Sequence, residues 1–478
     1  MIILPDLQAD DGEGHHLDRD GFIQTLADAF ARAQWELFVV GGAIRDELLG
    51  SPGHDIDFAT PARPTEIVRI LEALPGGSVY RVGEKFGTIG LVWGEFRAEV
   101  TTYRSAEAYP TGSRKPEVKY GWTLREDLAR RDFTINAMAR PAAGSVVIDP
   151  FGGVADVAGR VLRSVGKPSD RFREDPLRLL RGVRFAAGLD LTIEPETRQA
   201  IQDEARSLDS ISRERIADEL NRMLIGPHPV NALTLLRDSG LMAAAVPDLC
   251  RLTQMPDHGP RHPLSLWDHT MRVVEAVRPE LMRRWAALLH DIAKPETRSF
   301  EPGGRIRFLK HEEIGAVRAR ELLTGLRMPG ELVEGVVLLI ETHMQVHAYT
   351  ADWSDGAVRR LMNRLGRHFE AALELARSDA AAHDWGRSRN EPKLEALEQR
   401  ARRLRMEVPE VRSPLNGEQL MARYGLGPGR WIAAVKETLT EQVMEGQLRL
   451  DDEDQAWAEA DRLMQTMELE TGARRSVE

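Results

Sequence analysis

Two carboxylates stand two residues apart in the segment HDIDFAT, at Asp55 and Asp57. Alternate side chains of a β-strand project to the same face, so both carboxylates would lie side by side. Neighbouring carboxylates repel each other unless a cation lies between them. Magnesium ions held by such acids can activate an attacking hydroxyl and neutralise a leaving pyrophosphate. The motif predicts metal-dependent phosphoryl transfer, although an isolated pair of this type is more often an exposed surface turn.

A glycine pair precedes these acids, and a third acid follows them. Gly41 and Gly42 end a short apolar strand and would let the backbone approach a ligand, and the helix after them carries Arg45. The run FRAEVTT alternates as a strand does, and it would bring Glu99 beside the pair if the two strands are neighbours. The sequence therefore predicts catalytic acids at Asp55, Asp57 and Glu99, of which Asp55 and Asp57 would bind Mg²⁺.

A different pair, an acid beside an arginine, occurs in the segment RFREDPLRLLRGVRFA, residues 171–186. Asp175 and Arg178 are three residues apart and would lie on one side of a helix start. An acceptor beside a fork of donors can pair with the exocyclic amine and ring nitrogen of cytosine or adenine, and it repels uracil and guanine. The alternative is a plain capped helix, with Asp175 as the N-cap and Pro176 as the first helical residue.

Histidines and aspartates recur through the C-terminal half of the chain. An isolated histidine usually needs no special role, but neutral imidazoles combined with carboxylates suit Mn, Ni, Zn, Fe or Mg sites that hold a hydrolytic water. The predicted ligands, all expected on helices, are His269, His290, Asp291, His311, His343 and Asp379.

The elements that must position these residues differ between the two parts of the chain. Up to about residue 160, short β-branched runs alternate with helical stretches, which predicts a small α+β head. From about residue 170 onward, apolar residues recur at three- and four-residue spacing, which predicts an almost entirely helical body.

Composition limits what the protein can be. The chain has 478 residues, 42% hydrophobic and 29% charged, so several packed domains are expected. Cys250 is the single cysteine, which excludes an intramolecular disulfide and a thiolate zinc cluster and favours a cytoplasmic protein. No segment approaches the roughly 20 uninterrupted apolar residues needed to span a bilayer, so the protein is expected not to enter a membrane. The net charge of −11 means that any RNA-binding groove must concentrate its basic residues locally.

The segments GGAIRDELLG and HDIDFAT together resemble the signature of the class II tRNA nucleotidyltransferases, the family of bacterial CCA-adding enzymes and poly(A) polymerases. The segment RRDFTINAMA, with Arg130, resembles the family's sugar- and phosphate-contacting motif, and residues 174–178 resemble its EDxxR template motif. By this resemblance ISRERIADEL, residues 211–220, is a further neck motif with a mainly structural role. The implied nucleotide-binding residues are Gly41, Gly42, Arg45, Arg131, Asp132, Asn136, Glu174, Asp175, Arg178 and Arg181.

The histidine and aspartate series resembles the HD phosphohydrolase superfamily, with His311 and His343 where a second metal would take ligands. The resemblance implies hydrolysis of phosphomonoesters or 2′,3′-cyclic phosphodiesters on RNA ends. It also implies the fold: a polymerase-β-like nucleotidyltransferase head at residues 20–160, an all-α neck at 161–230, an HD domain at 231–400 and a helical, tRNA-binding tail at 401–478.

The implied reaction is addition of CCA to the 3′ end of tRNA from CTP and ATP. Residues 105–124 resemble the flexible loop that A-adding enzymes lack, which disfavours A-only addition, and the chain has no basic extension of the kind found in poly(A) polymerases. CC addition with a separate A-adding partner stays open. A further alternative is an HD phosphohydrolase whose head has become an RNA-binding module. The sequence does not give the oligomeric state.

Overall fold

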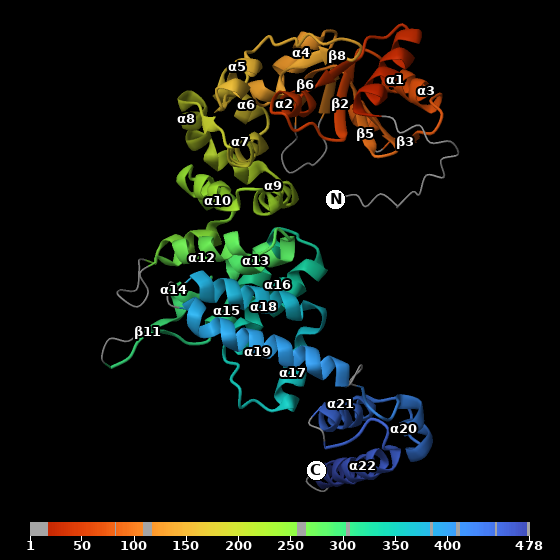
Figure 1. Ribbon diagram of the computed structural model, residues 1–478, viewed down its shortest axis with the longest axis vertical. Coiled ribbons are helices and arrows are strands. Elements are labelled where there is room, and N and C mark those ends of the chain that lie inside the picture. Colours follow the sequence, from red (N-terminus) through yellow and green to blue (C-terminus); the bar gives the residue numbers. More distant parts are fainter. Residues whose placement is uncertain are drawn as a thin grey trace. The chain divides into compact units, whose positions relative to one another are not determined.

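The computed structural model describes residues 18–475, except 82, 109–116, 256–263, 303–305, 383–385, 408–411 and 445–446 (Figure 1). The chain divides into two compact units, one formed by the residues up to Arg251 together with Leu322–Met328, the other by Leu252–Glu321 and Pro329–Glu478. In the described part of the chain, no helix is long and apolar enough to cross a bilayer.

A six-stranded mixed sheet forms the head of the first unit, in the order β3-β4-β5-β2-β1-β8. Strands β2 and β5 run parallel, and the other neighbours are antiparallel. The strands are β1 (Phe38–Val40), β2 (Asp55–Thr60), β3 (Ser78–Tyr80), β4 (Thr88–Trp93), β5 (Phe96–Thr102) and β8 (Ala139–Pro141). The α+β head predicted from the sequence is therefore confirmed.

The two faces of this sheet have different environments. On each strand, buried residues alternate with exposed ones. The buried residues are Ile56 and Phe58 on β2 and Ala98 and Val100 on β5, and the exposed residues between them are Asp57 and Glu99. Helices α1 (Arg19–Arg32) and α3 (Pro64–Glu72) bury their own apolar sides, and α3 packs on β3, β4 and β5. This alternation places Asp55, Asp57 and Glu99 on the accessible face.

Shorter elements complete the head. Strands β6 (Arg104–Ala108) and β7 (Glu117–Tyr120) form a separate hairpin whose turn lies outside the described residues. Helix α2 (Gly42–Leu48) follows the glycine pair, and α4 (Leu124–Ala129) begins with a capping box between Thr123 and Glu126. The 3₁₀ helix η2 (Thr134–Asn136) and α5 (Gly153–Ala158) follow.

Helices α6 (Pro168–Glu174), α7 (Leu177–Gly188), α8 (Pro195–Asp203), α9 (Arg213–Ile225), α10 (Pro229–Asp238) and α11 (Leu241–Ala245) form the neck. The predicted start of α7 was one residue early, because Pro176 occupies the N-cap and Asp175 accepts a hydrogen bond from the Leu177 amide over 3.1 Å. The expectation of a strand-free body was also too simple: β9 (Val161–Leu162) pairs with β10 (Thr192–Ile193).

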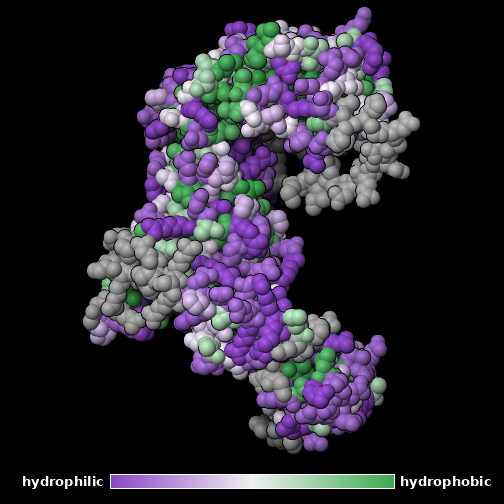
Figure 2. Space-filling view, in the orientation of Figure 1, coloured by the Kyte–Doolittle hydropathy of each residue, from purple (hydrophilic) through white to green (hydrophobic). Residues whose placement is uncertain are grey.

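The described residues of the second unit are helical apart from one hairpin. Helices α12 (Leu266–Ala276), α13 (Leu281–Leu289), α16 (Gly330–His347) and α18 (Phe369–Ala382) pack on one another. Around them lie α14 (Lys294–Thr297), α15 (His311–Gly325), α17 (Asp355–Leu365) and α19 (Gly386–Glu407). The hairpin consists of β11 (Arg298–Phe300) and β12 (Ile306–Phe308). The surface seen over α16–α19 is largely hydrophilic (Figure 2).

The C-terminal tail has a small hydrophobic core of its own. Helices α20 (Gly417–Tyr424), α21 (Arg430–Met444) and α22 (Glu453–Arg475) bury Leu420, Val435, Leu439 and Ala456 together. Gly425 ends α20 with a positive φ of 64°, so the glycine-rich segment before α21 is a turn.

Candidate active sites in the head and the helical body

The three head acids lie on neighbouring strands. Asp57 of β2 is in direct register with Glu99 of β5, and Asp55 lies two residues earlier on the same face. Removal from water raises the pKa of Asp57; Arg131 lowers it, and the charge of Asp55 raises it further. Burial, Asp57 and Asp55 also raise the pKa of Glu99. Raised pKa values at Asp57 and Glu99 beside a third carboxylate are what is expected of a site that a cation would complete.

Gly41 brings basic side chains close to these acids. Its φ is +70°, and a Cβ atom at this position would collide with the guanidinium of Arg131. The side chain of Arg45, which lies one turn later on α2, donates a 2.7 Å hydrogen bond to the side-chain oxygen of Asn136. The predicted glycine turn therefore has a specific steric role, which is to let Arg131 pass against the backbone.

The segment 130–136 connects the head to the neck. Arg130 and Arg131 both pair with the buried carboxylate of Asp127, at 2.7 and 3.1 Å. Asp132 accepts a 2.7 Å hydrogen bond from Arg181 of α7. Burial opposes ionisation of Asp132, but the charge of Arg181 and a hydrogen bond from Asn136 outweigh it and lower the pKa of Asp132 to about 2. The ion pair anchors α7 beside the nucleotide-binding residues predicted in the head.

The predicted selecting pair is held rigidly at the start of α7. Arg178 donates to the carbonyls of Arg130 (2.8 Å) and Arg171 (3.2 Å) and to the carboxylate of Glu174 (3.1 Å). Asp175 accepts a 2.8 Å hydrogen bond from Arg215 of α9. Asp175 and Arg178 are each only 8% exposed, so their orientation is fixed by these partners rather than by solvent.

One cavity of about 640 Å³ brings the head and neck residues together. Its lining does not include Gly41, Glu99 or Glu174. It does include the other predicted residues of the head and neck. Sequence reasoning did not assign a site role to several further residues that line it. The predicted residues in its wall are Gly42, Arg45, Asp55, Asp57, Arg130, Arg131, Asp132, Asn136, Asp175, Arg178 and Arg181, and the further ones include Arg104, Arg184, Phe185, Arg215 and Arg222.

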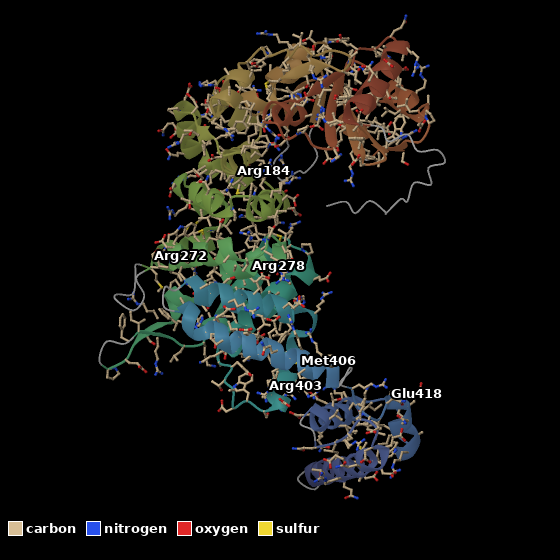
Figure 3. The ribbon with its side chains drawn as sticks, viewed as in Figure 1. Arg184, Arg272, Arg278, Arg403, Met406 and Glu418 are labelled. Carbon is tan, nitrogen blue, oxygen red and sulfur yellow. The ribbon has the colours of Figure 1, made fainter. Side chains whose placement is uncertain are left out.

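Phe185 provides an aromatic surface among the arginines of this cavity. The guanidinium carbons of Arg45, Arg181 and Arg184 lie 5.2, 5.2 and 4.2 Å from the centre of its ring. Figure 3 labels Arg184, which projects from α7 in the neck. Such a concentration of guanidinium groups provides the local positive field that a chain with a net charge of −11 needs in order to bind a triphosphate or RNA.

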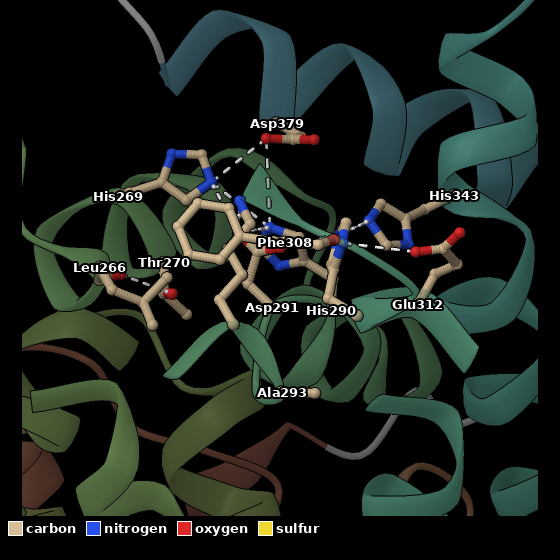
Figure 4. A network of polar contacts seen from close by, with 12 residues as sticks. Leu266, His269, Thr270, His290, Asp291, Ala293, Phe308, Glu312, His343 and Asp379 are labelled. Atoms are coloured by element: carbon tan, nitrogen blue, oxygen red, sulfur yellow. Dashed lines mark hydrogen bonds and ion pairs between the residues drawn. The ribbon is translucent and has the colours of Figure 1, made fainter. Parts of the chain in front are cut away.

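The histidine and aspartate residues predicted in the body form one buried cluster (Figure 4). Two groups of possible metal ligands share Asp291: His269, His290 and Asp291 in one, and Asp291, His311 and His343 in the other. Asp379 completes the first group, with its Oδ1 atom 3.1 Å from Nε2 of His269. His290 and Asp291 lie at the end of α13 and in the turn after it, rather than within a helix as expected.

The donor set fits divalent metal ions. His290, His311 and His343 direct their Nδ1 atoms at the backbone carbonyls of residues 287, 308 and 340 over 2.8, 2.9 and 2.5 Å. These bonds favour the Nδ1–H tautomer and leave the Nε2 lone pairs facing inward, where His311 and His343 approach to 3.2 Å. Burial first, and then His290, lower the pKa of His343 to about 3, which keeps its imidazole neutral.

Asp291 is the centre of this cluster. Burial works against its charge, but His290 and Lys294 hold its pKa well below the usual range. Its Oδ1 atom is buried and has no hydrogen-bond partner among the described residues. An ionised carboxylate with a buried oxygen of this kind, surrounded by converging imidazoles, would suit a ligand of a divalent metal ion.

Two further residues of the cluster were missed by sequence reasoning. Lys294, three residues after Asp291 in the chain, lies 2.6 Å from it, and His347 lies 2.8 Å from Oδ2 of Asp379. His347 follows His343 by four residues on α16, so helical spacing from a predicted ligand was the available signal. Both residues orient or neutralise the carboxylates of the cluster.

Three family models match successive parts of the chain. Residues 37–163 match the poly A polymerase head domain, residues 190–252 the probable RNA and SrmB-binding site of polymerase A, and residues 261–352 the HD domain.

Two curated relatives match over nearly their whole length. The A-adding tRNA nucleotidyltransferase of Deinococcus radiodurans is 33% identical over 88% of this chain and 95% of its own. The CC-adding tRNA nucleotidyltransferase of Thermus thermophilus is 34% identical over 88% of this chain and 93% of its own. The crystal structure of the Bacillus stearothermophilus CCA-adding enzyme in complex with CTP is similar to 95% of this chain and all of its own, with 27% identity and a TM-score of 0.65.

Proposed function

Since the chain belongs to the tRNA nucleotidyltransferase family, to which its full-length relatives at 33% and 34% identity assign it, we propose that it adds CCA to the 3′ end of tRNA from CTP and ATP. One observation carries the proposal. The head acids Asp55 and Asp57 and the base-selecting candidates Asp175 and Arg178 line the same cavity. A growing 3′ end and an incoming nucleotide can therefore meet between them.

The head supplies the chemistry of this reaction. Mg²⁺ bound by Asp55 and Asp57, with Glu99 as the third acid beside them, would polarise the attacking 3′ hydroxyl and neutralise the pyrophosphate that leaves. Arg45, Arg131 and the other guanidiniums of the cavity bind the triphosphate and fix its orientation. Because Arg131 and Arg45 already contact the Asn136 backbone and side chain, the phosphate site is largely ordered before substrate binds.

The neck supplies nucleotide selection. Arg178 has five N–H groups, of which three donate to Arg130, Arg171 and Glu174. Asp175, fixed by Arg215, keeps lone pairs available on both oxygens. The pair therefore presents an acceptor beside a donor, which complements the amine and ring nitrogen of cytosine and adenine and opposes uracil and guanine.

Full CCA addition is favoured over A-only addition by the hairpin β6–β7. This hairpin occupies the segment in which the sequence resembles a loop absent from A-adding enzymes. CC addition is the second candidate, because the Thermus thermophilus relative has that name and is similar over 93% of its length.

We also propose that the body hydrolyses phosphate esters at RNA ends. The observation that carries this second activity is the buried cluster around Asp291, in which two sets of ligands share one carboxylate. A divalent transition metal or Mg²⁺ there would supply Lewis acidity to a phosphate ester. Lys294, beside Asp291, adds a positive charge at the edge of the cluster.

Paired variants test both assignments. The double substitution Asp55→Ala, Asp57→Ala is expected to abolish the lengthening of a tRNA transcript that lacks CCA, while hydrolysis of a 2′,3′-cyclic phosphate is kept. The double substitution His290→Ala, Asp291→Ala is expected to do the reverse. If both activities disappear in either variant while the fold is retained, the assignment of two separate sites is wrong.

A further inference from the structure

The β11–β12 hairpin carries two aromatic rings on one of its faces. Register pairs Arg298 with Phe308 and Phe300 with Ile306, and cross-strand partners project to the same side. These four residues form what we call the aromatic face. Ser299 and Arg307, which pair with each other, alternate with these residues along the strands, and Arg307 also lines the cavity that Ile306 and Phe308 line. The hairpin therefore presents an apolar surface with one cation, rather than an alternation of core and solvent sides.

The β12 side of the aromatic face reaches the metal-ligand cluster. Phe308 and Ile306 line a cavity of about 320 Å³ together with His269, His311 and Lys294. The ammonium of Lys294 is 5.6 Å from the centre of the Phe308 ring. Figure 4 shows this ring beside the cluster residues. The cavity thus combines a ring and apolar side chains with the imidazoles and cation that suit a phosphate.

The β11 side of the aromatic face is more exposed. Phe300 is 67% exposed, and the guanidinium carbon of Arg298 lies 5.0 Å from the centre of its ring. An aromatic side chain on the surface gains nothing from the core, and an arginine stacked on it makes a surface suited to a planar, negatively charged partner. Nucleic-acid bases with their phosphates have this combination, since they stack on aromatic rings and on guanidinium planes.

The dimensions of the hairpin fit more than one nucleotide. The cavity is at the small end of the range for ligand pockets, about 300–1,000 Å³, so it suits a single nucleotide. Phe308 and Phe300 lie diagonally across the two strands, and diagonal neighbours are separated by about 7–8 Å, which is roughly the length of two stacked nucleotides at 3.4 Å each. When the terminal base of an RNA stacks on Phe308 in the cavity, the preceding nucleotides therefore lie at Phe300.

We infer that the aromatic face binds the last nucleotides of a single-stranded RNA 3′ end, with the terminal base on Phe308, the preceding nucleotides on Arg298 and Phe300, and the terminal phosphate at the His269–Asp291 cluster. The inference rests on the hydrolytic activity proposed above and narrows its substrate class. RNA ends of two or more unpaired nucleotides are the preferred substrates, and free mononucleotides use only the inner part of the surface.

Kinetics with two substrates separate the two rings. We would compare 2′,3′-cyclic AMP with a trinucleotide RNA that ends in a 2′,3′-cyclic phosphate. Phe300→Ala is expected to raise KM about tenfold for the trinucleotide and to leave KM for the mononucleotide unchanged, because stacking on one base is lost. Phe308→Ala is expected to raise KM for both. Val317→Ala, which removes another exposed apolar side chain from the same unit, is the matched control and should change neither KM.

A binding measurement that does not depend on hydrolysis completes the test. The trinucleotide carrying 5-iodouridine is irradiated with the full-length protein in EDTA, and the crosslinked peptides are identified by mass spectrometry. Crosslinks on residues 298–308 that disappear in Phe300→Ala support the inference. Crosslinks confined to other segments, or equal KM values for Phe300→Ala and the unaltered protein, overturn it. Crosslinks on the hairpin without hydrolysis of either substrate would instead overturn the proposed hydrolytic activity and leave the RNA-binding surface standing.

Discussion

Arg215 should control nucleotide selection by holding Asp175 in place. Its guanidinium donates a 2.8 Å hydrogen bond to Oδ2 of Asp175, and the two side chains are only 15% and 11% exposed. A hydrogen bond between charged groups contributes about 1.5–3 kcal/mol when buried. Asp175 keeps a second bond, from the Leu177 amide, so the loss in Arg215→Ala should be near the lower value.

About 1.5 kcal/mol corresponds to roughly a tenfold change in rate. Arg215→Ala is therefore expected to lower kcat/KM for both CTP and ATP about tenfold. UTP incorporation should fall less, since an Asp175 held only by the Leu177 amide no longer opposes the uracil carbonyl so strongly. Arg215→Lys restores a cation and should recover part of the discrimination against UTP.

The assay is addition of a single nucleotide to a tRNA transcript, with each nucleoside triphosphate supplied separately. Arg213→Ala is the matched control, because Arg213 lies two residues earlier on α9 and donates to the carbonyl of Ala245 instead. The explanation is refuted if Arg215→Ala keeps normal discrimination, or if CTP, ATP and UTP incorporation all fall equally, which would indicate general damage to the neck.

Three further predictions concern the glycine turn and the two metal sites. Gly41→Ala should lower kcat/KM for nucleotide addition, because it combines a backbone cost of about 1–2 kcal/mol with a collision of the new Cβ atom against Arg131. Gly50→Ala is the control: Gly50 has a φ of +74°, but no atom lies within 4 Å of the added Cβ. It has the backbone cost alone and should keep normal kcat/KM. Removal of divalent ions with EDTA should stop nucleotide addition, and Mg²⁺ should restore it; addition that continues in EDTA would contradict the role of Asp55 and Asp57. His290→Ala, Asp291→Ala should lose metal bound to the body, measured by plasma mass spectrometry, and unchanged metal content would show that the cluster is not a metal site.

Local pattern was sufficient to predict the head acids. Strand alternation placed Asp55 and Asp57 on one face, and the same rule identified Glu99 once β2 and β5 proved to be neighbours. The sequence alone did not establish that β2 and β5 are neighbours. Strand order depends on the packing of α3 and on contacts between segments about 40 residues apart.

Partners contributed by other helices could not be predicted in this way. Arg215 reaches Asp175 across 40 residues of sequence, and only the packing of α9 on α7 brings the two together. The sequence did not indicate that Phe185 lies in the site, because an aromatic residue at helical spacing usually belongs to a core. The strands β11 and β12 are three residues each, too short for an alternating pattern to be distinguished from a loop.

Some predictions remain predictions. The domain boundaries at residues 160, 230 and 400, the roles of individual site residues, the RNA contact of the tail and a cytoplasmic location each need their own experiment. The glycine-rich turn before α21 is present, but a turn at that position serves a purely structural tail equally well.

The central claim is that one cavity adds C, C and A in order, and stepwise extension tests it most directly. The protein and Mg²⁺ are incubated with tRNA transcripts that end before CCA, after C and after CC, with CTP and ATP supplied singly and together, and the products are sized. The account predicts that every transcript is completed to CCA and that neither UTP nor GTP is incorporated. Extension that stops at CC would identify a CC-adding enzyme, and no extension of any transcript would contradict the assignment of the head.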